Sequence, residues 1–378
     1  MDRRTFVKAT GVAGIAGLAG CSGGPTGGST ETETEAPTDA GGDGGGEETT
    51  AAETTASGPT ANIGMVYATG GLGDGSFNDQ ARQGVLKAEE KLGISFSQAQ
   101  PDQVSQFGAF QQQFAESTNP DYELVCCIGF LQADSLRQTA PAYPDQNFMI
   151  VDSVVDEPNV ASYTFKEHEG SYLAGLLASL LTTRDFSAGA GSTTGDSTNV
   201  GFVGGVESDL IKKFQAGYEA GVKAGDEDVD VLVNYTGSFN DPAAGKEAAL
   251  AMYNSGADIV YHASGNTGTG VFQAAQEKGK FAIGVDRDQS ITKPSYANVI
   301  LASMVKRVDT AVYNSIEAVV NDNFAGGTAV SLGLEKDGVA LIYGKQLGSE
   351  IPQGVKDRIA SAREDIIAGT ISVPTSPQ

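Results

Sequence analysis

Two loops of this chain share the pentapeptide GSFND, at Gly75–Asp79 and again at Gly237–Asp241. In each copy the phenylalanine, Phe77 or Phe239, stands between Gly-Ser and Asn-Asp, a polar setting that favours an exposed loop over a core. Two aromatic rings that face each other across a cleft can stack on a planar ring, which stabilises each stacked base by about 1–3 kcal/mol. The repeat therefore predicts an aromatic clamp. Plain core packing of the two rings is the alternative.

The polar residues that follow the two phenylalanines have a second interpretation as helix caps. Asp79 and Asp241 are each expected to cap a following helix, the second one directly ahead of Pro242. For Asn78, capping and ligand contact are equally supported.

Charged residues also stand at the ends of apolar segments. Asp152 ends NFMIVD and Asp286 ends FAIGVD, where a carboxylate is costly unless it is paired or solvated in a cleft. A carboxylate accepts hydrogen bonds from ligand N–H and O–H groups, although pairing with a helix N-terminus is the alternative. Lys306 is predicted to begin a helix, where a cation opposes the helix dipole, so we expect it to contact a polar ligand.

Apolar, β-branched runs alternate with helical stretches, which predicts an α/β fold with parallel sheets. Ligands of such sheets bind beyond the carboxyl ends of the strands, where all the candidate residues fall. The polar segment Thr182–Asn199 is predicted to be a disordered surface loop. The expected strands are Asn62–Ala68, Glu123–Gly129, Asn147–Asp152, Val200–Gly204, Val229–Tyr235, Asp258–Ala263, Phe281–Asp286, Asn298–Ser303 and Val339–Tyr343.

Composition excludes several classes of function. The chain has 378 residues and a net charge of −24, which argues against nucleic acid as a partner and is typical of proteins from halophilic archaea. Walker and HExxH motifs are absent from the sequence, which indicates a protein that is not an enzyme. His168 and His262 lack metal-ligand spacing, so neither a metal nor a cofactor is predicted. Cys126 and Cys127 are expected to be buried thiols on opposite faces of a strand.

The first sixty residues are typical of an exported, tethered protein. Residues 1–20 carry Arg3–Arg4 and a short apolar run, which predicts a Tat-type lipoprotein signal peptide. Cys21 follows Leu-Ala-Gly and is predicted to be lipidated. An ordinary cleavage site beside an accidental cysteine is the alternative. Residues 21–60 lack aromatic residues and aliphatic residues larger than alanine, so they are predicted to form a disordered acidic stalk.

With these features, the chain resembles the basic membrane protein family of PnrA-like purine nucleoside receptor lipoproteins, substrate-binding components of ABC importers. The resemblance runs from about Asn62 to Ala368. It is carried by GDGSFNDQA, LVCCIGFLQADSLRQTAPAYPDQNFMIVD, SYTFKEHEGSYLAGLLAS, VGFVGG, FQAGYEAGVKAG, YTGSFNDPAAGKEAALAMYNSGADIVYHASGNTGTGVFQAA, IGVDRDQ and SMVKRVD.

The resemblance implies a two-lobed periplasmic-binding-protein fold of the first type, in which each lobe is a parallel sheet flanked by helices and crossover strands join the lobes. Residues 61–164 plus 287–334 would form the N-terminal lobe, and residues 165–286 plus 335–378 the C-terminal lobe. It further implies a purine stacked between Phe77 and Phe239. Asp152 would read the base with Asn78 nearby, and the ribose would be held by Gly265, Asp286 and Lys306.

The function expected from the resemblance is capture of a nucleoside by a monomeric, lipid-anchored protein on the outer face of the cell membrane. Its partners would be the permease and ATPase subunits of an ABC importer. Three alternatives remain open: a binder of a sugar or autoinducer on the same fold, a sensor without transport, and a nucleoside hydrolase. The paired phenylalanines argue against the first, and the missing nucleophile and metal ligands argue against the last.

Overall fold

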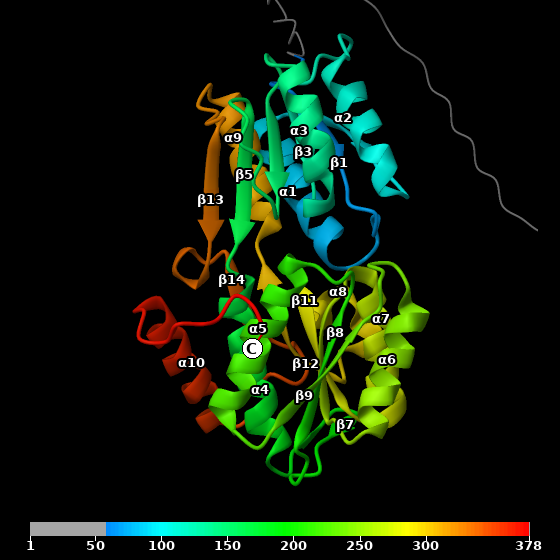
Figure 1. Ribbon diagram of the computed structural model, residues 1–378, viewed down its shortest axis with the longest axis vertical. Helices are drawn as coiled ribbons and strands as arrows, with labels where there is room; N and C mark the ends of the chain where they lie inside the picture. Colours follow the sequence, from blue (N-terminus) through cyan, green and yellow to red (C-terminus); the bar gives the residue numbers. More distant parts are fainter. Residues whose placement is uncertain (1–57, 378) are drawn as a thin grey trace, which may run out of the picture. The chain divides into compact units, whose positions relative to one another are not determined.

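The computed structural model describes residues 58–377, so the predicted signal peptide, Cys21 and nearly all of the stalk lie outside the described residues. Two six-stranded sheets dominate the described part (Figure 1). The first lobe comprises residues 58–165 and 308–332, and the second lobe comprises residues 166–307 and 333–377.

The first sheet is parallel throughout, in the order β13-β5-β4-β3-β1-β2. Successive residues of a strand point to opposite faces, and both faces are covered, so the inner strands β1, β3 and β4 are apolar on both sides. Cys126 and Cys127 accordingly pack on opposite faces as free, buried thiols, which confirms the prediction. The strands are β1 (Asn62–Val66), β2 (Ser95–Ala99), β3 (Leu124–Cys127), β4 (Phe148–Val151), β5 (Val160–Phe165) and β13 (Thr328–Leu332).

Helices cover both faces of this sheet. The apolar side chains of α2 and α3 share a core with one face, and those of α1 and α9 share a core with the other. Their bounds are α1 (Phe77–Leu92), α2 (Phe107–Ala115), α3 (Ala133–Ala142) and α9 (Val308–Val320).

The second sheet has the order β14-β12-β11-β10-β8-β9, and only β14 runs antiparallel to its neighbour. Its strands are β8 (Asn199–Gly204), β9 (Asp230–Tyr235), β10 (Ile259–Ala263), β11 (Phe281–Asp286), β12 (Ile300–Lys306) and β14 (Val339–Tyr343). Its helices are α4 (Glu167–Thr182), α5 (Asp209–Gly225), α6 (Pro242–Asn254), α7 (Gly268–Lys278), α8 (Gln289–Thr292) and α10 (Gln353–Ile367).

The chain crosses between the lobes three times: from β5 into α4, from β12 into α9, and from β13 into β14. This arrangement corrects the expected boundary, because residues 287–306, assigned above to the first lobe, include β12 of the second sheet. It also corrects the local prediction for Lys306. That residue ends β12, where it pairs with Val339 of β14, and the helix begins two residues later at Val308.

The segment Thr182–Asn199 is ordered, contrary to the prediction. It contains an antiparallel pair, β6 (Ser187–Ala188) with β7 (Gly191–Ser192). The ring of Phe186 packs 5.4 Å from that of Phe281, and the backbone N–H of Thr194 donates to the buried Asp258 carboxylate at 3.1 Å. One aromatic anchor and one buried acceptor thus order a segment whose composition resembles a linker.

Helices α4 and α5 pack so closely that glycine is required along their contact. A Cβ added at Gly221 would lie 2.0 Å from the carbonyl oxygen of Tyr172, and one at Gly175 would lie 2.0 Å from that of Tyr218. Because these neighbours are backbone atoms, the helices would have to separate to admit a methyl group.

We expect Gly221→Ala to lower the free energy of unfolding by about 1–3 kcal/mol, as overpacking does in cores. Gly354→Ala is the matched control, since nothing lies within 4 Å of a Cβ added there. Chemical denaturation of both variants measures the difference. Equal stability of the two would contradict the close packing described here.

Candidate functional site

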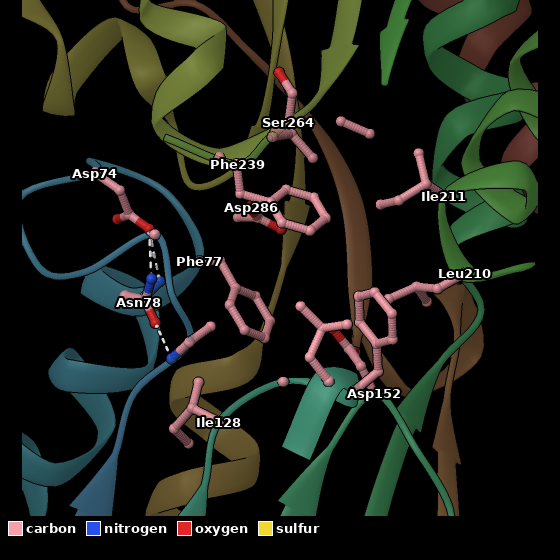
Figure 2. A pocket seen from close by; sticks show the side chains of 18 of the residues that line it. Asp74, Phe77, Asn78, Ile128, Asp152, Leu210, Ile211, Phe239, Ser264 and Asp286 are labelled. Atoms are coloured by element: carbon pink, nitrogen blue, oxygen red, sulfur yellow. Dashed lines mark hydrogen bonds between the residues drawn. The ribbon is translucent and has the colours of Figure 1, made fainter. Parts of the chain in front are cut away.

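A pocket with an empty volume of about 640 Å³, counting the part open to solvent, lies where the carboxyl ends of both sheets meet (Figure 2). The structure brings together in its lining every residue predicted from the sequence to bind ligand: Phe77, Asn78, Asp152, Phe239, Gly265, Asp286 and Lys306. Each stands at the carboxyl end of a strand, in the loop that follows it or at the start of the next helix, because parallel strands deliver their following loops to one edge of the sheet.

The first GSFND copy is held by two carboxylates of its own loop. Asp74 accepts hydrogen bonds from the backbone N–H groups of Ser76 at 2.8 Å and Asn78 at 2.9 Å, so it caps the start of α1. Asp79 accepts from Gly73 and Gly75, upstream in the loop, and therefore does not cap the helix as predicted. In the second copy Asp241 accepts from Ala244 N–H at 3.0 Å, which confirms the predicted cap of α6.

Asn78 links this loop to the end of β1. Its Oδ1 accepts from the Ala68 N–H at 2.9 Å, and its Nδ2 donates to Asp74 Oδ2 at 3.2 Å. An amide nitrogen carries two hydrogens, and this is the only hydrogen bond it makes among residues 58–377. Asn78 can therefore offer one N–H donor to the pocket.

Phe77 and Phe239 line the pocket from different lobes, and both rings are partly exposed. Phe239 lies against Gly205, where an added Cβ would come within 2.4 Å of its ring. A third ring, Phe130, meets Phe239 edge-on with centroids 6.4 Å apart and planes at 85°. Phe130 was missed in the sequence, although its position directly after the strand that ends in Gly129 was a usable signal.

Asp152 and Lys306 form a buried ion pair between the lobes. Lys306 Nζ lies 2.6 Å from Asp152 Oδ2, and the side chains are 2% and 3% exposed. Burial alone would lower the pKa of Lys306, but the carboxylates of Asp152, Glu167 and Asp286 outweigh it and raise that pKa, so the ammonium stays charged. Asp152 Oδ1 is buried and has no hydrogen-bond partner within residues 58–377.

The ion pair brings together two residues that we expected at different parts of the ligand. The predicted base contacts were Asp152 with Asn78 nearby, yet in the view of Figure 2 the two residues lie on opposite sides of Phe77. Asp152 instead pairs with Lys306, which was expected at the ribose.

Asp286 ends β11 with a left-handed backbone, φ 65°, as Asp152 does after β4 with φ 68°. The hydroxyl of Ser76 from the first lobe donates to Asp286 Oδ2 at 2.5 Å. Burial raises the pKa of Asp286 from 3.8 to about 6, although the Lys306 charge and the Ser76 hydrogen bond lower it. Gly265, φ 57°, also needs a left-handed backbone and lies against Phe239.

The charges that line the pocket are unbalanced. Three carboxylates, those of Asp74, Asp152 and Asp286, face a single ammonium, that of Lys306. The remaining wall is largely apolar and includes three residues of α5 that were not predicted from the sequence to line a site: Leu210, Ile211 and Phe214. Such a site suits a flat, uncharged molecule with several hydrogen-bond donors.

Residues 58–377 hold no group of three or more His, Cys, Asp or Glu placed to bind a metal ion. The same residues include no helix long and apolar enough to cross a membrane. His262 is buried and contacts Gln289 Oε1 at 2.8 Å, and burial lowers its pKa to about 4, in keeping with the expected structural role.

Comparisons with known proteins agree with one another. The family described as "ABC transporter substrate-binding protein PnrA-like" matches residues 61–376. The "ABC transporter nucleoside-binding protein BmpA" of Lactococcus lactis is 34% identical, over 82% of this chain and 88% of the relative. An uncharacterized lipoprotein of Pyrococcus horikoshii is 33% identical, over 77% of this chain and 71% of the relative.

The crystal structure of an ABC transporter solute-binding protein from Aeropyrum pernix superposes with a TM-score of 0.74 at 29% identity, covering 84% of this chain and 94% of that one. A solute-binding protein from Conexibacter woesei shares the fold, with a TM-score of 0.65 at 21% identity, over 83% of this chain and 99% of that one. The expected periplasmic-binding-protein fold is therefore confirmed.

Proposed function

This chain belongs to the PnrA-like family of ABC transporter substrate-binding proteins, and from that premise we propose that it captures a purine nucleoside outside the cell. It delivers the nucleoside to the permease and ATPase subunits of an ABC importer. The observation that carries this proposal is the pocket itself, where one partly exposed phenylalanine from each lobe meets three carboxylates and one ammonium.

In this proposal the base lies between Phe77 and Phe239. Asn78 offers its remaining N–H to an acceptor on the base. The ribose hydroxyls reach the other end of the site, where Asp152 Oδ1 and Asp286 can accept and Lys306 can donate, with Gly265 allowing close approach. The Lactococcus lactis relative is named a nucleoside-binding protein, which supports the same ligand class.

The site binds and releases its ligand unchanged, as substrate-binding proteins do, so no catalytic step is proposed. We further propose a monomer that is exported by the Tat route and tethered through lipidated Cys21 and the 21–60 stalk to the outer face of the cell membrane. Relatives named as lipoproteins support the anchor.

Calorimetric titration of the protein in concentrated salt tests the ligand class. We expect guanosine, inosine or adenosine to bind, and ribose and glucose not to bind. Guanosine 5′-monophosphate should bind roughly 100-fold more weakly than guanosine, because its phosphate meets a pocket of net negative charge, where like charges at close range cost several kcal/mol. Binding of sugars without any nucleoside would instead support a sugar or autoinducer binder.

Removal of either aromatic ring tests the clamp. Phe77→Ala and Phe239→Ala should each weaken nucleoside binding by about 1–3 kcal/mol, the worth of one stacked base. Both rings are partly exposed, so the melting temperature should change little. Phe148→Ala is the contrasting control: it empties a fully buried core position away from the pocket and should lower stability by about 3–5 kcal/mol. A similar fall in melting temperature in all three variants would show that the two rings pack as core residues.

The pH dependence of affinity tests Asp286. Its pKa of about 6 means that the carboxylate gains a proton as the pH falls from 7 to 5. A ligand hydroxyl binds the ionised acceptor better, so affinity should fall about tenfold over this range and recover as the pH rises. Asp286→Asn should bind more weakly at pH 7 and show a flat profile. An unchanged pH profile in that variant would assign the titration to another group.

A further inference from the structure

Glu167 is a fully buried carboxylate that stands behind the pocket and not in its lining. It is the first residue of α4, directly after the crossover from β5. Its Oε2 accepts from Lys213 Nζ at 3.0 Å, and its Oε1 lies 3.5 Å from Lys306 Nζ without a hydrogen bond among residues 58–377. A carboxylate at 0% exposure is costly to bury, so its neighbours must explain it.

The ammonium of Lys306 lies between two carboxylates, one from each lobe. Asp152 Oδ2 in the first lobe is 2.6 Å away, and Glu167 Oε1 in the second lobe is 3.5 Å away. The rings of Phe77, Phe165 and Phe214 surround the same nitrogen at 4.8–5.5 Å from their centroids. The short contact uses one of the three N–H groups, which leaves donors for a ligand.

Glu167 and Lys306 belong to the same lobe, and each stands at a crossover, Glu167 just after the first and Lys306 just before the second. Their separation is therefore fixed by α4 and β12 within one lobe, whereas the contact with Asp152 depends on the other lobe. Without Glu167, Asp152 would be the only carboxylate among residues 58–377 at ion-pair distance from the ammonium, and the two would pair at the expense of the ligand.

We propose that Glu167 is a positioning residue for ligand binding, which holds the Lys306 ammonium so that its free N–H groups and Asp152 Oδ1 remain available to the ligand. The inference rests on the proposed function and deepens it. Glu167 acts only through Lys306 and does not touch the ligand.

A double-mutant cycle on the full-length protein tests this role. The four proteins are wild type, Glu167→Gln, Lys306→Met and the double variant, and the readout is the calorimetric Kd for guanosine, inosine and adenosine. We expect Glu167→Gln to weaken binding roughly tenfold. The double variant should bind no more weakly than Lys306→Met alone, since Glu167 has nothing to position once the ammonium is gone. Glu207→Gln, an exposed acid paired with Lys212 at 2.8 Å, is the control and should bind normally.

The outcomes are distinguishable. Unchanged affinity in Glu167→Gln, or losses that multiply in the double variant, overturns the inference while the proposed function stands. A wild-type protein that binds no nucleoside overturns both. If Glu167→Gln does not fold, Glu167→Leu combined with Lys213→Met removes a paired carboxylate and ammonium together. Its affinity is then compared with that of Lys213→Met alone, and the same tenfold difference is expected.

Discussion

The buried ammonium of Lys306 is the constraint around which the site is built. A charge at 2% exposure must be compensated, and three carboxylates do so from different elements: Asp152 after β4, Asp286 at the end of β11, and Glu167 at the start of α4. Lys306, Asp286 and Glu167 belong to the second lobe, whereas Asp152 belongs to the first, so the full set of three carboxylates forms only where the lobes meet at their carboxyl edges. The Asp152–Lys306 ion pair therefore both lines the pocket and joins the two lobes.

Backbone conformation places the acids where this charge needs them. Asp152 and Asp286 both adopt left-handed φ values, an uncommon conformation for a residue other than glycine. Asp286 is the last residue of β11 and Asp152 directly follows β4, and their carboxylates contact Ser76 and Lys306, respectively. Two strands in different lobes therefore end in the same way, each directing an aspartate into the pocket.

The two GSFND copies show how one sequence can have different local roles. The phenylalanines have equivalent places, since each lines the pocket from its own lobe. The residues after them differ. Asp241 caps α6, whereas Asp79 accepts hydrogen bonds from the backbone of Gly73 and Gly75. The first turn of α1 is capped by Asp74. A pentapeptide identifies the residue types of a loop, but its hydrogen bonds depend on the spacing of donors around it. The shared function of the copies is limited to the ring.

The sequence by itself determined the alternation of strands and helices, and with it the edge at which every candidate residue would lie, because a parallel sheet sends all its carboxyl ends one way. It could not show that Asp152 pairs with Lys306 across 154 residues of chain, that Glu167 lies behind that pair, or that Phe130 meets Phe239. Nor could it show that Thr182–Asn199 is ordered. These features depend on contacts between segments far apart in the chain. The local sequence pattern predicts which face of a strand or helix a residue occupies. Its contact partner on that face depends on how the two lobes pack.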